Sequence, residues 1–341
     1  MAATKSALPV VGITMGDPVG VGPEIIVRAL SSPLLYGICR PLVIGDVRVL
    51  VDTARWLGIK VRCRSLEKHG EAAYEYGAID VLNLSGLEPE KLRWGRPSTA
   101  TGAAMVKYII RAIDLAMEGS INAMTTAPIN KLAMRKAGFD FDGHTEILAQ
   151  RTKTTDYVMM LAGETLRVTL VTIHCALSEV PGRLTSRKIF DVIRLTEEAL
   201  RQRFGIKAPR IAVAALNPHA GESGLFGDEE SRIIFPAVQR ARDAGMNITD
   251  PIPCDTLFCY AQKGDYDAVV CMYHDQGLIP FKMLHFSDGV NLTLGLPIIR
   301  TSCDHGTAYD IAGKGEAAPE SLVAAVRMAA EHAKIRMGAL A

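Results

Sequence analysis

Short runs of apolar residues alternate with longer amphipathic stretches along almost the whole chain. The runs are nearly continuous in apolar character, which is typical of β-strands that are covered on both faces of a sheet. Buried strands are therefore expected at residues 10–14, 41–45, 121–125, 166–173, 211–216, 268–273 and 296–299.

The stretches between these runs have helical spacing. Residues 185–204 place Ile189 and Leu200 on one face, behind Thr185 or Ser186 as a capping residue. Strands that alternate with helices predict an α/β protein with a largely parallel sheet between helical layers. Further helices are expected at residues 23–30, in the stretch up to Trp56, and after residues 319–321.

The length of 341 residues corresponds to two domains at about 150 residues each. No stretch rich in Pro, Gly and Ser separates two halves of the chain. Two domains would therefore share the sheet or exchange segments.

The charge balance limits the partners. Lys and Arg number 38 and Asp and Glu 37, so the formal net charge is +1. A protein that coats nucleic acid or an anionic membrane needs an excess of basic residues, so neither partner is expected. The hydrophobic content of 48% excludes a disordered chain.

The N-terminal residues, the length of the apolar runs and the cysteines favour a cytoplasmic protein. Residues 1–9 lack the charged start and apolar middle of a signal peptide, and no apolar run reaches the roughly 18 residues of a membrane helix. The seven cysteines are scattered and contain no CxxC pair, so neither a disulfide framework nor a structural zinc knot is expected.

Several common catalytic motifs are missing. The sequence has no P-loop, no GxSxG nucleophile elbow and no HExxH zinc motif. A GxGxxA match at residues 313–318 follows no predicted strand, so we interpret it as a loop before the last helix.

Three histidines follow three of the predicted strands. His174 closes the strand at 166–173, His219 follows the strand at 211–216, and His274 closes the strand at 268–273. The carboxyl ends of parallel strands share one edge of a sheet, and ligands bind at that edge. Three imidazoles gathered there would form a divalent-metal site with open positions for substrate. Asp275 is an alternative ligand, and the alternative for each histidine is a purely local hydrogen bond.

Other polar residues at element ends suit an anionic substrate. His144 and Thr145 open a predicted helix, where free backbone N–H groups favour a phosphate. Lys282, Asn291 and Arg300 follow within one short stretch, and the lysine and the arginine would add positive charge. The glycine-rich loop at residues 15–23 is either a further anion site or a simple strand–helix turn.

These motifs together resemble the PdxA family, the 4-hydroxythreonine-4-phosphate dehydrogenases of pyridoxal phosphate biosynthesis and their relatives that act on 4-phosphothreonate. The resemblance runs in order from about Val10 to the last helix. The segments that carry it are residues 16–24, 143–146, 217–222, 273–277, 295–302 and 304–308.

The resemblance implies a fold and an assembly. The fold class would be α/β, with two α/β/α domains flanking a cleft, as in isocitrate and isopropylmalate dehydrogenases. Residues 1–138 with 295–341 would form the first domain and residues 139–294 the second. The protein would be a homodimer.

The resemblance also implies site residues. The metal ligands would be His174, His219 and His274, shared between the two subunits and holding one Zn²⁺, Mg²⁺ or Co²⁺. The cofactor would be NAD or NADP, with its binding residues unassigned. The residues that contact a small phosphorylated hydroxy acid would be His144, Thr145, Lys282, Asn291 and Arg300.

The implied reaction is metal-dependent oxidation and decarboxylation of 4-phosphohydroxy-L-threonine. The metal would lower the pKa of the substrate hydroxyl, and the resulting β-keto acid would lose CO₂. Lys282 or Asp255 would be the general base. The segments 224–230 and 286–291 lean towards 4-phosphothreonate as an alternative substrate. A metal- and phosphate-binding protein with acyltransferase-like rather than redox chemistry is the rival from another class.

Overall fold

The computed structural model describes residues 8–338. Residues 1–7, on which part of the expectation of no signal peptide rests, lie outside the described residues. Within the described part, no helix is long and apolar enough to cross a membrane. All seven cysteines lie within it and form no disulfide.

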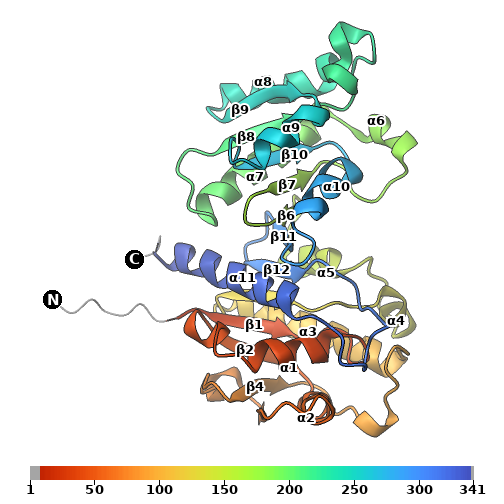
Figure 1. Ribbon diagram of the computed structural model, residues 1–341, viewed down its shortest axis with the longest axis vertical. Coiled ribbons are helices and arrows are strands. Elements are labelled where there is room, and N and C mark those ends of the chain that lie inside the picture. Colours follow the sequence, from red (N-terminus) through yellow and green to blue (C-terminus); the bar gives the residue numbers. More distant parts are fainter. Residues whose placement is uncertain (1–7, 339–341) are drawn as a thin grey trace, which may run out of the picture. The chain divides into compact units, whose positions relative to one another are not determined.

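The chain divides into two compact units (Figure 1). Unit 1 comprises the described parts of Met1–Thr154 and Leu296–Ala341, and unit 2 comprises Thr155–Gly295. The chain thus leaves unit 1 once, completes unit 2 and returns. The boundaries predicted from the sequence stand at 138/139 and 294/295, so residues 139–154, with His144 and Thr145, fall in unit 1 instead of unit 2.

Unit 1 contains six strands in the order β3-β4-β2-β1-β5-β12, and all neighbouring strands are parallel. Helices α1, α3 and α11 pack on this sheet or on one another. The strands are β1 Val10–Thr14, β2 Arg40–Gly45, β3 Arg62–Leu66, β4 Ala78–Asn83, β5 Ala123–Thr126 and β12 Arg300–Cys303. The helices are α1 Gly22–Leu30, α2 Val47–Trp56, α3 Thr99–Met117, α4 Lys131–Lys136, α5 His144–Thr152 and α11 Glu320–Gly338.

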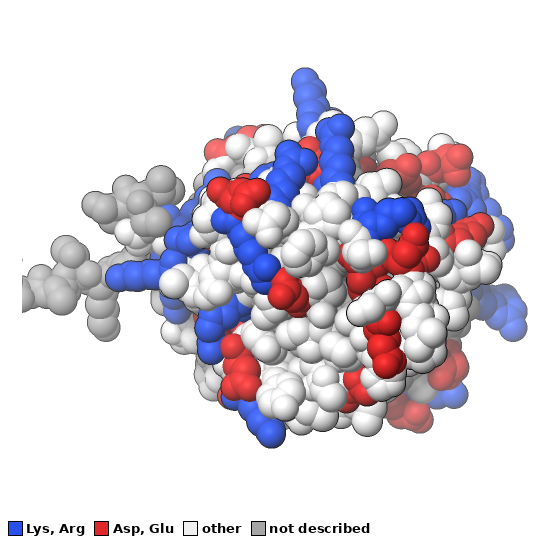
Figure 2. Space-filling view, turned by 90° about the horizontal axis from the view of Figure 1, so that it is seen from above, with Lys and Arg blue, Asp and Glu red and all other residues white. Residues whose placement is uncertain are grey.

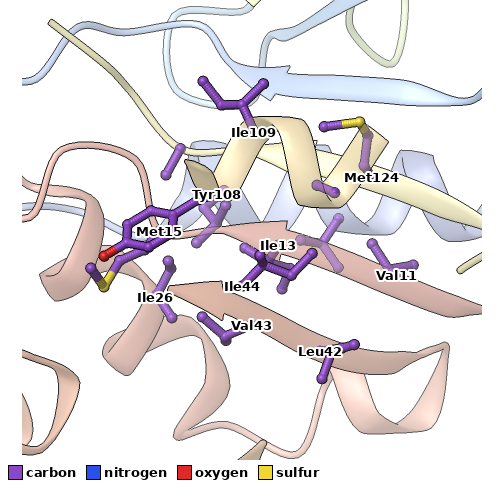
Figure 3. Close-up of a cluster of buried hydrophobic side chains, with 14 of the residues drawn as sticks. Val11, Ile13, Met15, Ile26, Leu42, Val43, Ile44, Tyr108, Ile109 and Met124 are labelled. Atoms are coloured by element: carbon purple, nitrogen blue, oxygen red, sulfur yellow. The ribbon is translucent and has the colours of Figure 1, made fainter. Parts of the chain in front are cut away.

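The core of unit 1 lies on both faces of its central strands. Val11, Ile13 and Met124 are completely buried, as are Leu42 and Ile44 of the neighbouring strand. Figure 3 shows these side chains between the strands and the surrounding helices. A strand buried on both faces has a continuous apolar sequence, which explains why β1 and β2 were predictable from their apolar runs.

Unit 2 contains six strands in the order β11-β6-β7-β10-β8-β9. Strand β6 is antiparallel to both of its neighbours, and the remaining pairs are parallel. The strands are β6 Val158–Ala162, β7 Arg167–Leu170, β8 Arg210–Ala214, β9 Asn247–Ile252, β10 Ala268–Cys271 and β11 Val290–Leu294. The helices are α6 Val180–Arg183, α7 Ser186–Gln202, α8 Phe235–Asp243, α9 Cys254–Ala261 and α10 His274–Leu284.

The structure confirms one local prediction and corrects another. Helix α7 is confirmed, with Thr185 as its N-cap accepting a hydrogen bond from the Lys188 N–H. The predicted strand at residues 296–299 is wrong, because the strand is β12, which begins at Arg300. Pro297 has no backbone N–H to donate to a neighbouring strand, and the segment meets β5 only at its end, where the Ile299 carbonyl accepts the Met124 N–H at 2.9 Å.

The charged surface agrees with the near-zero net charge. Figure 2 shows acidic and basic side chains interspersed on one face, with no broad area of a single sign. The GxGxxA match at residues 313–318 forms the loop before α11, as predicted. Gly313 has a positive φ of 78°, and a Cβ there would lie 2.4 Å from Trp94 Cγ. That glycine therefore serves a tight turn against an indole ring.

Candidate active site

The three strands that precede the histidines are neighbours in the sheet of unit 2. Strand β10 lies between β7 and β8 and is parallel to both. Their carboxyl ends therefore share one edge, as predicted. The strands are shorter than expected: β7 ends at Leu170 and β10 at Cys271, so His174 lies in a loop and His274 begins helix α10.

Hydrogen bonds beyond the strands hold these ends together. The Thr172 N–H and hydroxyl both donate to the Met272 carbonyl, at 3.1 and 2.7 Å. Gln276, which is 7% exposed, donates to the Ala215 carbonyl and accepts from the Met272 N–H, both at 2.6 Å. Gln276 thus connects the end of β10 to the end of β8.

Helix α10 lies close against the sheet because of a glycine. A Cβ on Gly277 would lie 2.9 Å from Cys271 Sγ and 3.1 Å from Leu170 Cδ2. A larger residue would push the helix away from β10 and β7. The Gly277 of the His274–Gly277 segment therefore fixes the distance of His274 from the sheet.

Two of the three imidazoles are close to each other. The ring centroids of His174 and His274 are 6.0 Å apart. His274 Nδ1 lies 2.7 Å from Asp275 Oδ1, which leaves Nε2 for another partner. A metal-binding histidine characteristically uses its second ring nitrogen in this way, on a carboxylate that orients the ring.

His219 begins a run of left-handed backbone. Residues 219–224 all have positive φ, and His219 itself has φ 52° and ψ 29°. This conformation costs roughly 1–2 kcal/mol for each residue other than glycine, so the surrounding structure must enforce it. His219 is exposed, and its ring centroid is 6.1 Å from that of Phe226.

The donor set suits a divalent transition metal. Neutral imidazole nitrogens are good ligands for Zn²⁺ and Co²⁺, whereas Mg²⁺ prefers oxygen. The pairing of His174 with His274 and the Asp275 contact fit such an ion. Among residues 8–338 of a single chain, no three His, Cys, Asp or Glu side chains are grouped closely enough to hold one. The three-histidine set therefore stays a prediction.

Unit 1 brings His144 and Arg300 together. Arg300 is 3% exposed, and its Nη2 donates to Thr126 Oγ1 at 2.8 Å. Burial lowers the pKa of Arg300 to about 10, which leaves it charged at neutral pH. Burial and the nearby Arg300 charge hold the pKa of His144 well below its usual value, so this imidazole is neutral.

The polar groups around His144 suit an anion. His144 and Thr145 are the first two residues of α5, whose N-cap Gly143 makes no side-chain capping bond. His144 Nε2 is sealed from solvent and has no hydrogen-bond partner among the described residues. Beside a helix N-terminus, the buried guanidinium can supply positive charge to a phosphate and the neutral imidazole can supply a hydrogen bond.

Lys282 and Asn291 lie at the two ends of the segment that joins α10 to β11 in unit 2. Lys282 lies in the last turn of α10, with Nζ 5.9 Å from the Phe286 ring centroid, and Asn291 lies in β11. The buried His285 between them contacts Asp288 Oδ2 at 3.0 Å and Thr165 Oγ1 at 2.9 Å. His285 therefore fixes this connection, a role that no motif indicated.

The last two candidates have different surroundings. Asp255 is exposed in the first turn of α9. The loop at residues 15–23 is tightly filled by protein atoms: a Cβ on Gly22 would lie 2.2 Å from the Met15 carbonyl oxygen. Asp17 in this loop is buried, accepts from the Val19 N–H at 3.1 Å, and is contacted by the Tyr309 hydroxyl. The strand–helix turn is therefore the better interpretation of this loop.

The fold and these polar residues define an α/β protein with a buried His144–Arg300 corner in one unit and three histidines after neighbouring strands in the other. The family model described as "Pyridoxal phosphate biosynthetic protein PdxA" matches residues 37–329. The chain therefore belongs to the PdxA family.

Individual relatives agree along almost the whole length. A 4-hydroxythreonine-4-phosphate dehydrogenase of Desulforapulum autotrophicum is 55% identical over 327 residues, covering 96% of both chains. A D-threonate 4-phosphate dehydrogenase of Cupriavidus necator is 48% identical over 330 residues, covering 96% of this chain and 98% of that one. A crystal structure of 4-hydroxythreonine-4-phosphate dehydrogenase from Klebsiella pneumoniae superimposes with a TM-score of 0.90 at 43% identity, covering 97% and 99% of the two chains.

Proposed function

We propose that the protein is a metal-dependent, NAD(P)-linked dehydrogenase that oxidises and decarboxylates 4-phosphohydroxy-L-threonine in pyridoxal phosphate biosynthesis. The relatives with this name and the PdxA family match support the reaction class. The single observation in the structure that carries the proposal is the His144–Arg300 corner, which suits the phosphate of such a substrate.

The residues of unit 1 would hold the phosphate. Arg300 supplies a permanent charge, since its lowered pKa of about 10 still lies well above neutrality. Thr126 orients the guanidinium, and the neutral His144 adds a hydrogen bond without a competing charge. Thr145 and the first N–H groups of α5 complete the anion site.

Residues of unit 2 would hold the metal. His174, His219 and His274 would hold one Zn²⁺ or Co²⁺, which suit nitrogen ligands better than Mg²⁺ does. When bound, such an ion supplies positive charge beside the substrate oxygen, and NAD or NADP supplies a hydride acceptor. Lys282 and Asn291 would bind the substrate from the same unit.

The proton of the substrate hydroxyl needs a base in this chain. Lys282 and Asp255 are the two candidates. Lys282 is half-buried near Phe286, and Asp255 is exposed. Loss of the base should lower kcat more than it raises KM, and it should remove the acidic limb of the pH–rate profile. Separate Lys282→Met and Asp255→Asn variants therefore distinguish them.

The proposal includes a homodimer in the cytoplasm, with the three histidines of each metal site drawn from both subunits. His174 and His274 of one chain lie close enough to act together, which is compatible with a His219 from the partner. Mixed dimers test this arrangement. Inactive His219→Ala and His274→Ala chains should regain activity when they are combined if the ligands come from different subunits.

D-threonate 4-phosphate is the second candidate substrate. The relative of that name from Cupriavidus necator is nearly as similar as those named for hydroxythreonine phosphate. The two compounds share the phosphate, the C3 hydroxyl and the carboxylate, and differ at C2, where one has an amino group and the other a hydroxyl. The phosphate corner therefore suits both.

Formation of NADH or NADPH at 340 nm tests the proposal. The purified protein is assayed with Zn²⁺ or Co²⁺ and with each compound in turn. A kcat/KM at least tenfold higher for 4-phosphohydroxythreonine supports the proposed substrate. The reverse ratio replaces it by D-threonate 4-phosphate, and no cofactor reduction with either compound contradicts the dehydrogenase proposal.

A further inference from the structure

We propose that Glu230 is a positioning residue, whose buried carboxylate enforces the left-handed turn that presents His219 to the divalent ion. This inference rests on the proposed role of His219 as a metal ligand. Glu230 lies eleven residues after His219 and was not among the site residues predicted from the sequence.

The turn itself requires an external restraint. Four residues other than glycine adopt positive φ within residues 219–224: His219 at 52°, Ala220 at 54°, Glu222 at 42° and Ser223 at 58°. Successive left-handed residues of this kind are disfavoured for L-amino acids. At the start of the turn the Ala220 N–H donates to the Asn217 carbonyl at 3.2 Å.

Glu230 supplies the restraint immediately before the turn. Its Oε1 accepts the Leu216 N–H at 2.8 Å and the Asn217 N–H at 2.7 Å. Its Oε2 accepts the Asn217 side-chain amide at 3.0 Å. A carboxylate that is 7% exposed therefore satisfies three donors on the two residues at the entrance of the turn.

The same carboxylate also limits the middle of the turn. A Cβ on Gly221 would lie 2.8 Å from Glu230 Oε2 and 3.0 Å from the Gly227 carbonyl oxygen. Gly221 therefore lies directly against the carboxylate. Contacts at both the entrance and the centre leave the turn little freedom to change its direction.

The carboxylate is anchored in turn. Glu230 begins a short π-helical segment, Glu230–Ile234, that continues into α8. Ile233 and Ile234 of this segment are buried, and the segment contacts α7. The core of unit 2 therefore fixes the position of Glu230. Through its hydrogen bonds to Leu216 and Asn217, Glu230 restrains the turn that carries the exposed His219.

Glu229 provides a matched control. Its Oε2 accepts the Asn217 side-chain amide at 2.7 Å, whereas Glu230 also accepts the backbone N–H groups of Leu216 and Asn217. Glu229→Gln and Glu230→Gln are the same chemical change at adjacent positions. In Glu230→Gln, an NH₂ group would oppose either a backbone N–H or the Asn217 amide.

The experiment measures Co²⁺ binding to the intact protein without substrate or cofactor, from the visible absorption of the bound ion. Circular dichroism and thermal unfolding of each variant establish that it is folded at the temperature used. His219→Ala serves as the reference for a lost ligand. Replacing a group that orients a metal ligand typically weakens metal binding 10- to 100-fold.

The proposal predicts that folded Glu230→Gln binds Co²⁺ at least tenfold more weakly, whereas Glu229→Gln stays within twofold of the wild type. Wild-type affinity in folded Glu230→Gln overturns it, because a purely structural Glu230 would change only the unfolding temperature. If Glu230→Gln does not fold, Gly221→Ala displaces the same turn and keeps the carboxylate. For Gly221→Ala too, Co²⁺ binding at least tenfold weaker than in the wild type supports the proposal, and wild-type affinity overturns it.

A failure of the metal site itself gives a different result. If the wild type binds no Co²⁺, or if His219→Ala binds it as well as the wild type does, the role of His219 as a ligand is wrong. That result overturns both the metal part of the proposed function and the role of Glu230. Weak binding by His219→Ala with normal binding by Glu230→Gln overturns the role of Glu230 alone.

Discussion

The side-chain amide of Gln276 donates to the backbone carbonyl of Ala215 at 2.6 Å, while its oxygen accepts the Met272 N–H at the same distance. Ala215 follows strand β8, which leads to His219, and Met272 follows β10, which leads to His274. One buried amide thus connects the ends of the two strands that precede His219 and His274. A glutamine can do this because it offers a donor and an acceptor from one planar group.

Gln276→Met should lower the free energy of unfolding by about 1–3 kcal/mol. Methionine has a similar size but leaves the buried Met272 N–H without its acceptor and removes a donor to Ala215. Urea unfolding checks this value. The same change at the exposed Gln239, whose side-chain amide donates to Asp243, should stay within about 0.5 kcal/mol. Equal effects at the two positions would contradict the connecting role.

His144 should make stability depend on pH below about 6.5. Burial and Arg300 lower the pKa of His144 in the folded protein below the value of 6.5 expected in the unfolded chain. Between these two pKa values the unfolded chain binds more protons, so the free energy of unfolding falls as the pH drops.

His144→Asn should remove this part of the pH dependence, which amounts to at most about 1.4 kcal/mol for each pH unit. Urea unfolding of both proteins between pH 7.5 and 5.5 gives the comparison. The wild type should lose more stability than the variant over this range. Parallel curves would show that the folded protein does not hold His144 in its neutral form.

Gly163→Ala should displace His285 and so disturb the segment between Lys282 and Asn291. A Cβ at position 163 would lie 2.2 Å from Cγ of the buried His285 ring, which Thr165 and Asp288 hold in place. We expect a loss of about 1–3 kcal/mol in stability and a higher KM for the phosphorylated substrate.

Gly37→Ala is the control for this change, because a Cβ at position 37 meets no atom within 4 Å. It should leave both the stability and KM close to those of the wild type. A Gly163→Ala enzyme with normal stability and normal KM would show that the imidazole does not restrain this connection.

Arg300→Gln should lower kcat/KM roughly 10- to 100-fold, because a charged hydrogen bond to a phosphate contributes about 1.5–3 kcal/mol. The loss should fall mainly on KM if Arg300 binds the phosphate equally in the ground state and the transition state. Arg336→Gln, an exposed arginine that donates to the Pro297 carbonyl, is the control. A variant with unchanged kcat/KM would remove Arg300 from the substrate site.

The apolar runs predicted the central strands well because those strands are covered on both faces. Strands β3 and β9 were not predicted, because two residues of each are exposed and the segments are correspondingly polar. Strands β4, β6 and β11 were also missed, although most of their residues are buried. The strand at 296–299 was predicted wrongly for a related reason. Burial makes a segment apolar whether or not its backbone joins a sheet, and Pro297 has no N–H to donate to a ladder.

The residues of the candidate site also differ in how far the sequence could predict them. His174, His219 and His274 could be selected because each follows a strand, and the adjacency of β7, β10 and β8 confirms the common edge. The roles of Gln276, Glu230 and His285 were not predictable, since each depends on contacts with residues outside its own motif. The left-handed turn at His219 was also hidden, because only Gly221 and Gly224 within it are glycines.

The most direct test of the central claim is cofactor reduction by metal-depleted enzyme. The protein is treated with a chelator, passed into chelator-free buffer, and assayed at 340 nm with 4-phosphohydroxythreonine and D-threonate 4-phosphate before and after addition of Zn²⁺ or Co²⁺. We predict no reduction before the addition and restored activity after it, with His219→Ala inactive in both states. Full activity of the metal-depleted wild type would contradict the metal-dependent dehydrogenase.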